Sequence, residues 1–224
     1  MNIFKQKIKE SLPDYIIDWY QMRQVKQEFD AYRYGHDDNL LKAFDKHKVL
    51  FIHIPKTAGI SVRDSLFQTH GFSKHVKAQT YKYYLGKTTF NSYFKFAFVR
   101  NPWARTLSAY NFLKKGGINE VDKNWSDAVL SQYDSFEDFV MNGLHTEEVI
   151  NWTHFIPQYK WLCDHKNRNL MDFTGRLESI EADYEYIRER TGIGLPLKHK
   201  NKGKTIESYR NFYTETMQNK VVEL

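Results

Sequence analysis

Lys56 is the residue whose surroundings in this sequence point most clearly to chemistry. It lies in a short loop with Thr57, Gly59 and Ser61, between an apolar run at 49–54 and a segment with helical spacing at 60–67. A strand, a tight loop and a helix in this order aim backbone N–H groups and the positive end of the helix at an anion. The lysine adds a point charge, and the two hydroxyls add donors. The stretch therefore predicts a phosphate- or sulfate-binding turn.

This loop departs from the phosphate-binding pattern G-x-x-x-x-G-K-[ST], because Lys56 precedes the only glycine of the loop. The alternative is an ordinary strand-to-helix turn whose lysine is solvated. The residues of this stretch alone leave both interpretations open.

A second unit of the same kind follows along the chain. Residues 93–99 predict a core strand that runs directly into Arg100, and Pro102 suits the first turn of a helix. Arg100 thereby comes at the C-terminal end of a strand, where α/β sheets bind their ligands. Ser108 follows about two helical turns farther on, and the arginine and serine could grip one phosphate from two sides. Taken alone, Arg100 could instead be a structural arginine paired with a carboxylate.

Composition limits the classes of protein that this chain can be. Its 224 residues suit one domain, 1–224. Because 41% of the residues are hydrophobic and 16% are aromatic, the composition is that of a folded chain and excludes a disordered one. The net charge of +6 favours an anionic ligand. The single cysteine, Cys163, excludes an internal disulfide and a multi-cysteine zinc site. No apolar run approaches the length of a membrane-spanning helix, and the N-terminus lacks an apolar signal-peptide core.

The remaining segments predict an α/β organisation. Residues 1–48 read as helices on the outside of the domain, the second of them over 14–34, and residues 49–224 as its core. A third strand is expected at 170–173, followed by a helix that stops at Gly192. Ser135 and Asp138 form a capping pattern at the start of another helix.

Together the two motifs resemble a known family. The first reads His-Ile-Pro-Lys-Thr-Ala-Gly-Ile-Ser and the second Phe-Ala-Phe-Val-Arg-Asn-Pro-Trp-Ala-Arg-Thr-Leu-Ser-Ala-Tyr. Both are similar to the motifs of the membrane-type and carbohydrate sulfotransferases, and the resemblance runs from about Val49 to the C-terminus. It implies a three-layer, P-loop-kinase-like α/β fold with a central, mainly parallel sheet flanked by helices. It also implies 3′-phosphoadenosine 5′-phosphosulfate as the sulfuryl donor.

The resemblance assigns roles to individual residues. Lys56 would stabilise the leaving phosphate, and the backbone around Thr57, Ala58, Gly59 and Ile60, with the Ser61 hydroxyl, would hold the 5′-phosphate. The 3′-phosphate would be held by Arg100, Ser108 and a late basic loop that contains Lys202, Gly203 and Lys204. No metal is required, and the sequence has no ligand cluster with metal-binding spacing.

The acceptor hydroxyl also needs a group that takes its proton, and histidine is the usual choice. His75 is the first candidate, because its placement before the second core strand is similar to that of the base in related glycan sulfotransferases. His154 is the second candidate, and its segment resembles the family's acceptor cleft, so it is expected to bind substrate. A surface histidine at position 75 and a carboxylate base both stay open.

The leading hypothesis is thus a metal-independent sulfotransferase that acts in the cytoplasm on a carbohydrate or glycoconjugate hydroxyl. A P-loop kinase for a small molecule is the alternative, although the chain lacks the kinase-type lysine placement and a clear Mg²⁺-binding carboxylate. A nucleic-acid partner is not expected, because the basic residues accompany the motifs and form no continuous tract. Peripheral association with a membrane stays open, and the sequence does not identify the acceptor.

Overall fold

Three parallel strands form the centre of the protein. The structure, a computed structural model, describes residues 14–35, 39–69, 75–198 and 209–224. Strands β1 (Val49–Ile52), β2 (Phe94–Val99) and β3 (Phe173–Arg176) pair in that order. Every residue of β1 is buried, as is typical of a parallel strand covered on both faces. The prediction of an α/β fold with a parallel sheet flanked by helices is confirmed.

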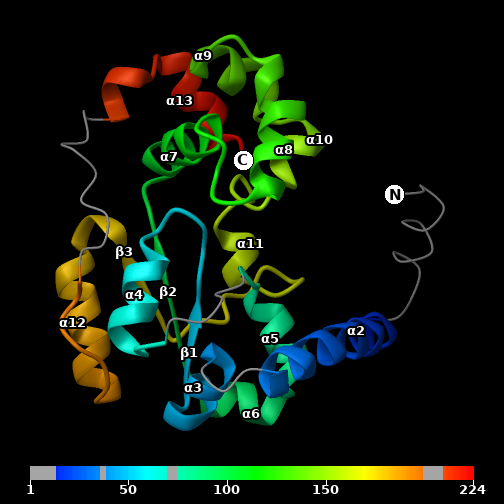
Figure 1. The fold of residues 1–224 in the computed structure, drawn as a ribbon, viewed down its shortest axis with the longest axis vertical. Helices are drawn as coiled ribbons and strands as arrows, with labels where there is room; N and C mark the ends of the chain where they lie inside the picture. Colours follow the sequence, from blue (N-terminus) through cyan, green and yellow to red (C-terminus); the bar gives the residue numbers. More distant parts are fainter. Residues whose placement is uncertain (1–13, 36–38, 70–74, 199–208) are drawn as a thin grey trace.

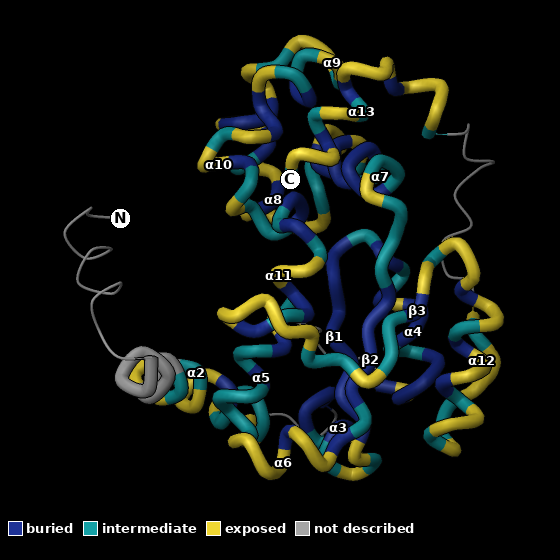
Figure 2. The backbone as a smooth tube through the Cα atoms, turned by 180° about the vertical axis from the view of Figure 1, so that it is seen from behind, coloured by how far each residue is buried: buried dark blue, intermediate teal, exposed yellow. Residues whose placement is uncertain are grey.

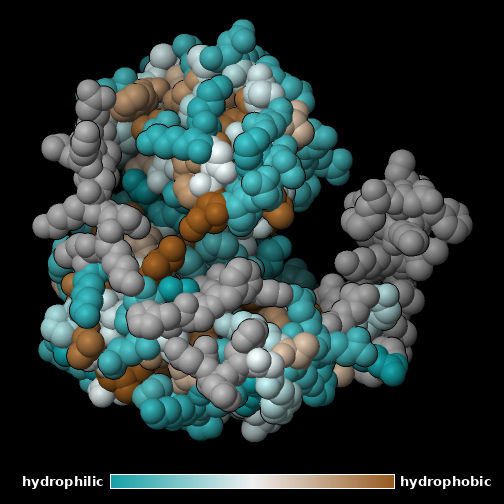
Figure 3. Space-filling model, in the orientation of Figure 1, coloured by the Kyte–Doolittle hydropathy of each residue, from teal (hydrophilic) through white to brown (hydrophobic). Residues whose placement is uncertain are grey.

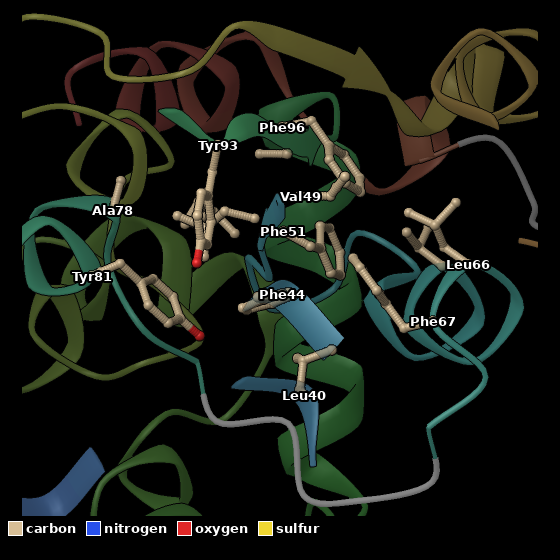
Figure 4. Close-up of a cluster of buried hydrophobic side chains, with 14 of the residues drawn as sticks. Leu40, Phe44, Val49, Phe51, Leu66, Phe67, Ala78, Tyr81, Tyr93 and Phe96 are labelled. Carbon is tan, nitrogen blue, oxygen red and sulfur yellow. The ribbon is translucent and has the colours of Figure 1, made fainter. Parts of the chain in front are cut away.

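Helices cover this sheet and share one hydrophobic core with it. Figure 1 shows the sheet between α4 and α12 on one side and α5 on the other. Figure 4 shows the buried side chains at its centre, where the rings of Phe51 and Phe96 stack at 5.0 Å. We call this part the sheet region; its helices are α2 (Asp14–Gly35), α3 (Leu40–His47), α4 (Gly59–Leu66), α5 (Ala78–Leu85), α6 (Lys87–Ser92), α11 (Tyr159–Leu162), η3 (Leu177–Ser179) and α12 (Ile180–Thr191).

A second hydrophobic core lies in an all-helical part above the sheet in Figure 1. In the tube view its inward-facing turns are buried and its outer turns exposed (Figure 2). We call it the helical region; it consists of α7 (Pro102–Lys114), α8 (Glu120–Ala128), η1 (Leu130–Gln132), α9 (Phe136–Asp138), η2 (Phe139–Gly143), α10 (Glu147–Ile150), η4 (Tyr209–Phe212) and α13 (Glu215–Val222).

Several sequence-based boundaries agree with these elements. The helix expected at 14–34 is α2, and α12 ends where Gly192 takes a left-handed conformation, with φ of 68°. Ser135 caps α9 by accepting a hydrogen bond from the Asp138 backbone N–H at 3.0 Å. The helix expected before α2 in 1–48 lies outside the described residues. Among the described residues, the structure has no helix both long and apolar enough to cross a bilayer.

The third strand was expected at 170–173, and that boundary is wrong. Leu170 N donates to Leu162 O at 3.0 Å, so this part of the chain pairs with the end of α11. Asp172 then uses its carboxylate to accept the Lys95 backbone N–H at 2.8 Å. The chain enters the sheet only at Phe173, opposite Phe96. Apolar residues alone did not reveal this, because Leu170 and Met171 are apolar although they lie before the strand.

Candidate active site

The first motif forms the loop between β1 and α4. Lys56 and Ala58 both have left-handed backbones, with φ of 70° and 62°, which side chains other than glycine rarely adopt. The Thr57 hydroxyl donates to Ile54 O at 2.9 Å and fixes the turn from inside. Alternating left-handed residues turn successive N–H groups toward one concave side, which suits an anion. The Thr57 hydroxyl is thus used within the loop, and its backbone N–H is the group left to face a ligand.

Gly59 is required by a close approach within this loop. A Cβ built on Gly59 would lie 1.7 Å from Cδ2 of the His53 ring. His53 is buried at the end of β1, and burial holds its pKa well below the usual histidine value. The neutral His53 ring therefore packs directly against the first residue of α4.

The second motif meets the first one. Strands β1 and β2 are parallel neighbours, so both motifs leave the sheet at the same edge. Arg100 Nη1 donates to the carbonyl oxygen of Lys56 at 3.3 Å. Asn101 accepts the Ala104 N–H at 3.1 Å and caps α7, in which Pro102 is the first residue, as predicted.

Gln158 fixes the backbone of Arg100. The Arg100 N–H donates to Gln158 Oε1 at 2.9 Å, and Gln158 Nε2 donates to Arg100 O at 2.8 Å. The glutamine amide thus pairs with this residue as a peptide group of a neighbouring strand would. It ties the segment after His154 to the end of β2.

Arg105 joins the loop between β1 and α4 to the segment of His154. Its side chain is 5% exposed; Nε donates to Pro55 O at 3.1 Å and Nη2 to His154 O at 3.0 Å. Burial lowers its pKa to about 10, so the guanidinium stays charged at neutral pH. One side chain therefore sets the distance between two segments that are about 100 residues apart in sequence.

The Lys56 ammonium lies over an aromatic ring in this cluster. Its Nζ is 3.9 Å from the centroid of Phe112, a cation–π contact from α7. Burial, followed by the charge of Arg100, lowers the pKa of Lys56 to about 8, while Asp122 acts in the opposite direction. Lys56 is thus still mostly protonated at pH 7, but it loses its proton more readily than an exposed lysine does.

His75 has the tautomer that a general base needs. Its Nδ1 lies 2.8 Å from the His53 carbonyl oxygen, which can only accept, so Nδ1 carries the hydrogen. Burial lowers the pKa of His75, against the hydrogen bond to His53 and the charge of Asp122, so the ring is neutral at pH 7. Nε2 of the neutral ring therefore has the free lone pair.

His154 is buried behind these groups. Its ring centroid lies 5.1 Å from Phe112 and 6.4 Å from His75. Burial, followed by the charges of His75, Lys56 and Arg105, lowers its pKa to about 3. Its Nδ1 has no hydrogen-bond partner among the described residues, and Asp122 Oδ1, at 3.8 Å, is too far for one. His154 is therefore a much weaker base than His75.

Three cations, Lys56, Arg100 and Arg105, are brought together at this point. In the described part of the chain, none of them forms an ion pair with a carboxylate, although Glu178 and Asp122 act on them from a distance. Partly buried like charges are costly unless an anion compensates them. In the space-filling view the surface is hollowed between the two regions, with hydrophilic residues inside the hollow (Figure 3). Such an arrangement of cations is suited to binding an anion.

Comparison with known proteins identifies the family of this chain. A family model described as "Sulfotransferase family" matches residues 40–223. The chain belongs to the sulfotransferase family. The match begins at α3, whose Leu40, Leu41 and Phe44 are buried in the core of the sheet region.

Individual relatives are similar over part of the chain. Carbohydrate sulfotransferase 11 of Mus musculus is 33% identical over 147 residues, which cover 57% of this chain and 41% of the mouse protein. Carbohydrate sulfotransferase 14 of Danio rerio is 27% identical over 175 residues, or 66% of this chain and 47% of the fish protein. An uncharacterized protein of Archaeoglobus fulgidus is 30% identical over 50% of this chain and 77% of its own length. The match thus spans less than half of either carbohydrate sulfotransferase, and no solved structure matches the chain significantly.

The other residues proposed for this sulfotransferase-family site are placed unequally. Ser61 is buried in the first turn of α4, and Ile60 beside it is 39% exposed. Ser108 is half-buried on α7, two turns beyond Arg100. Lys202, Gly203 and Lys204 lie outside the described residues. Within the described ranges, no group of three His, Cys, Asp or Glu side chains is arranged to hold a metal ion.

Sequence reasoning missed four residues of this site: Arg105, Phe112, Asp122 and Gln158. Arg105 was within the quoted motif, and its place in the second turn of α7 was a usable signal. Gln158 was within the segment of His154 that resembles the family, but it was given no role. Phe112 and Asp122 lie outside the quoted motifs. Only the fold brings them to the loop of Lys56.

Proposed function

We propose that this protein transfers the sulfuryl group of 3′-phosphoadenosine 5′-phosphosulfate to a hydroxyl of a carbohydrate acceptor. The observation that carries the proposal is the contact between the two motifs, in which Arg100 Nη1 donates to Lys56 O at 3.3 Å. Two cationic motifs that meet at one sheet edge suit a donor with two separate phosphate groups. Family membership supports sulfuryl transfer as the reaction.

The two ends of the donor would be held by different segments. The left-handed loop at Lys56–Ala58, the N-terminus of α4 and the Ser61 hydroxyl would bind the 5′-phosphosulfate. Arg100 and Ser108, with the loop of Lys202, Gly203 and Lys204, would bind the 3′-phosphate. A 3′-phosphate site separates this donor from ATP, the donor of the kinase alternative.

The chemistry then requires one base and one cation. His75 Nε2 takes the proton of the acceptor hydroxyl as the acceptor oxygen forms a bond to sulfur. The bond from sulfur to the bridging oxygen breaks, and adenosine 3′,5′-bisphosphate leaves. The Lys56 ammonium stabilises the negative charge that develops on that bridging oxygen. In this scheme Lys56 and His75 carry the chemical step, and no step requires a metal.

A carbohydrate or glycoconjugate acceptor is supported by two of the relatives, which are named carbohydrate sulfotransferases. Figure 3 shows the surface hollowed between the two regions, and we propose that the acceptor binds there. A cytoplasmic location and a single-domain organisation stay predictions.

The test is an assay with ³⁵S-labelled donor and a panel of glycans. We expect donor-dependent labelling of at least one glycan. Lys56→Ala should reduce the rate by about 100- to 1,000-fold, as for the loss of one charge-stabilising group. Arg100→Ala should mainly weaken the binding of adenosine 3′,5′-bisphosphate in calorimetry.

The matched control is Lys87→Ala, which removes an exposed lysine at the start of α6. It should retain wild-type activity and binding. Retention of full activity by both Lys56→Ala and Arg100→Ala would refute the proposal, as would the absence of bisphosphate binding by the wild type.

A further inference from the structure

Asp122 is a buried carboxylate that the mechanism above does not use. It lies in the first turn of α8 and is 5% exposed. Its Oδ2 accepts the Ile118 N–H at 3.2 Å, and its own N–H donates to the capping Asn119 Oδ1 at 2.9 Å. Gly117 packs against it so closely that a Cβ there would lie 2.1 Å from the Asp122 Cβ. The side chain is therefore fixed in position by its own helix start.

The second oxygen of this carboxylate faces the candidate active site. Oδ1 lies 3.8 Å from His154 Nδ1, and His154 packs on Phe112, over which Lys56 Nζ lies. Within the described ranges, the imidazole of His154 is the only basic group at ion-pair distance from Asp122. A carboxylate normally stays out of such a position unless a positive charge compensates it.

The charges around the two reacting groups show what this carboxylate does. Lys56 faces one other cation, Arg100, and His75 faces two, Arg105 and Lys56, beside the neutral rings of His53 and His154. The cations favour the uncharged forms of both Lys56 and His75. For both, Asp122 is the carboxylate whose charge favours the protonated form.

We infer that Asp122 is a positioning residue whose negative charge stabilises the protonated forms of Lys56 and His75 during transfer. The inference rests on the proposed function, because it assigns the charge to that reaction. Lys56 must be protonated to stabilise the leaving oxygen, and His75 becomes an imidazolium when it takes the acceptor proton. Asp122 touches neither substrate; it acts through the field across His154 and Phe112.

The decisive variant is Asp122→Asn, which keeps an oxygen for the Ile118 N–H and removes the charge. Its control is Asp127→Asn on the same helix, where the carboxylate is 64% exposed and pairs with Lys123 at 2.7 Å. The first measurement needs no substrate: the pH dependence of acetylation of Lys56 by acetic anhydride, followed by mass spectrometry. We expect the midpoint to move to lower pH by about 0.5 unit or more in Asp122→Asn and to stay unchanged in Asp127→Asn.

The second measurement is the pH profile of sulfuryl transfer. In Asp122→Asn both limbs should move to lower pH, the acidic limb with His75 and the alkaline limb with Lys56, and the maximal rate should fall about 10- to 100-fold. A merely structural loss would lower the rate without moving either limb. Asn119→Ala, which removes the cap of α8 and leaves the charge, should lower stability while the limbs stay in place.

The outcomes separate the inference from the proposed function. An unchanged Lys56 midpoint in Asp122→Asn overturns the inference, whatever the assay shows. If the midpoint shifts in Asp122→Asn but the wild-type protein transfers no sulfuryl group, the electrostatic role of Asp122 is supported and the proposed function is refuted. If Asp122→Asn does not fold, Asp122→Glu is used, which keeps the charge; a midpoint that departs from the wild-type value would overturn the inference.

Discussion

The sheet region and the helical region both supply this site, in different ways. The sheet region contributes the Lys56 loop, Gly59 and His75, and the first two lie within one strand–loop–helix unit. The helical region contributes Phe112, Asp122 and His154 from three separate segments. In the proposed function, the first set would bind an anion through local geometry. The second set would adjust the charge of the first, and its position depends on how the two cores pack.

Gly59 tests whether the local geometry of the Lys56 loop determines anion binding, and we expect it to give the largest effect. Gly59→Ala places a Cβ 1.7 Å from the His53 ring, so the ring or the start of α4 must move. We expect a loss of about 3 kcal/mol in the free energy of unfolding, measured by urea denaturation, and at least tenfold weaker binding of adenosine 3′,5′-bisphosphate. Gly35→Ala, where the added Cβ meets nothing within 4 Å, should change neither quantity. A stable Gly59→Ala protein with wild-type affinity would contradict this account of the loop.

Arg105 tests the link between the regions. Arg105→Lys keeps the charge but cannot bond both Pro55 O and His154 O with the same geometry. Leaving one buried carbonyl unsatisfied should lower the free energy of unfolding by about 1–3 kcal/mol. If the link also sets the position of the helical-region groups, kcat should fall while the affinity for the bisphosphate changes little. A stability loss with unchanged kcat would reduce Arg105 to a role in folding.

His154 of the helical region should make the stability of the protein depend on pH below pH 6.5. Its pKa is about 3 in the folded protein and near 6.5 when unfolded, so below 6.5 the unfolded state binds the extra proton. Stability should therefore fall as the pH drops from 6.5 toward 3, by about 2 kcal/mol between pH 7 and pH 5 from this group. His154→Gln should remove that part of the slope in denaturation curves. The exposed His165→Gln is the control, and an unaltered slope in His154→Gln would show that His154 is not buried in its neutral form.

The sequence predicted the parts of the site that depend on neighbours in the chain. The apolar run before Lys56 and Pro102 after Arg100 were enough to predict a strand before the first motif and a helix after the second, and the family resemblance implied that the two motifs bind one donor. Residues 170–173 misled, because Leu170 and Met171 are apolar like strand residues, yet Leu170 N bonds to Leu162 O before the chain enters the sheet. Asp122 could not be found in this way. It is an acidic residue in the first turn of a helix, a common place for one, and only the tertiary contact with His154 makes it unusual.

The pairing of Gln158 with Arg100 has a mechanical consequence. The chain leaves the sheet region for the helical region just after Arg100 and returns just after Phe155, so these two described crossings lie side by side. The two bonds of the Gln158 amide join one crossing to the other. A connection through one segment would let the two regions rotate about it, whereas two segments joined by hydrogen bonds oppose that rotation. Gln158→Glu would replace the donor Nε2 with a second carboxylate oxygen facing Arg100 O, so this contact between the two crossings would become repulsive.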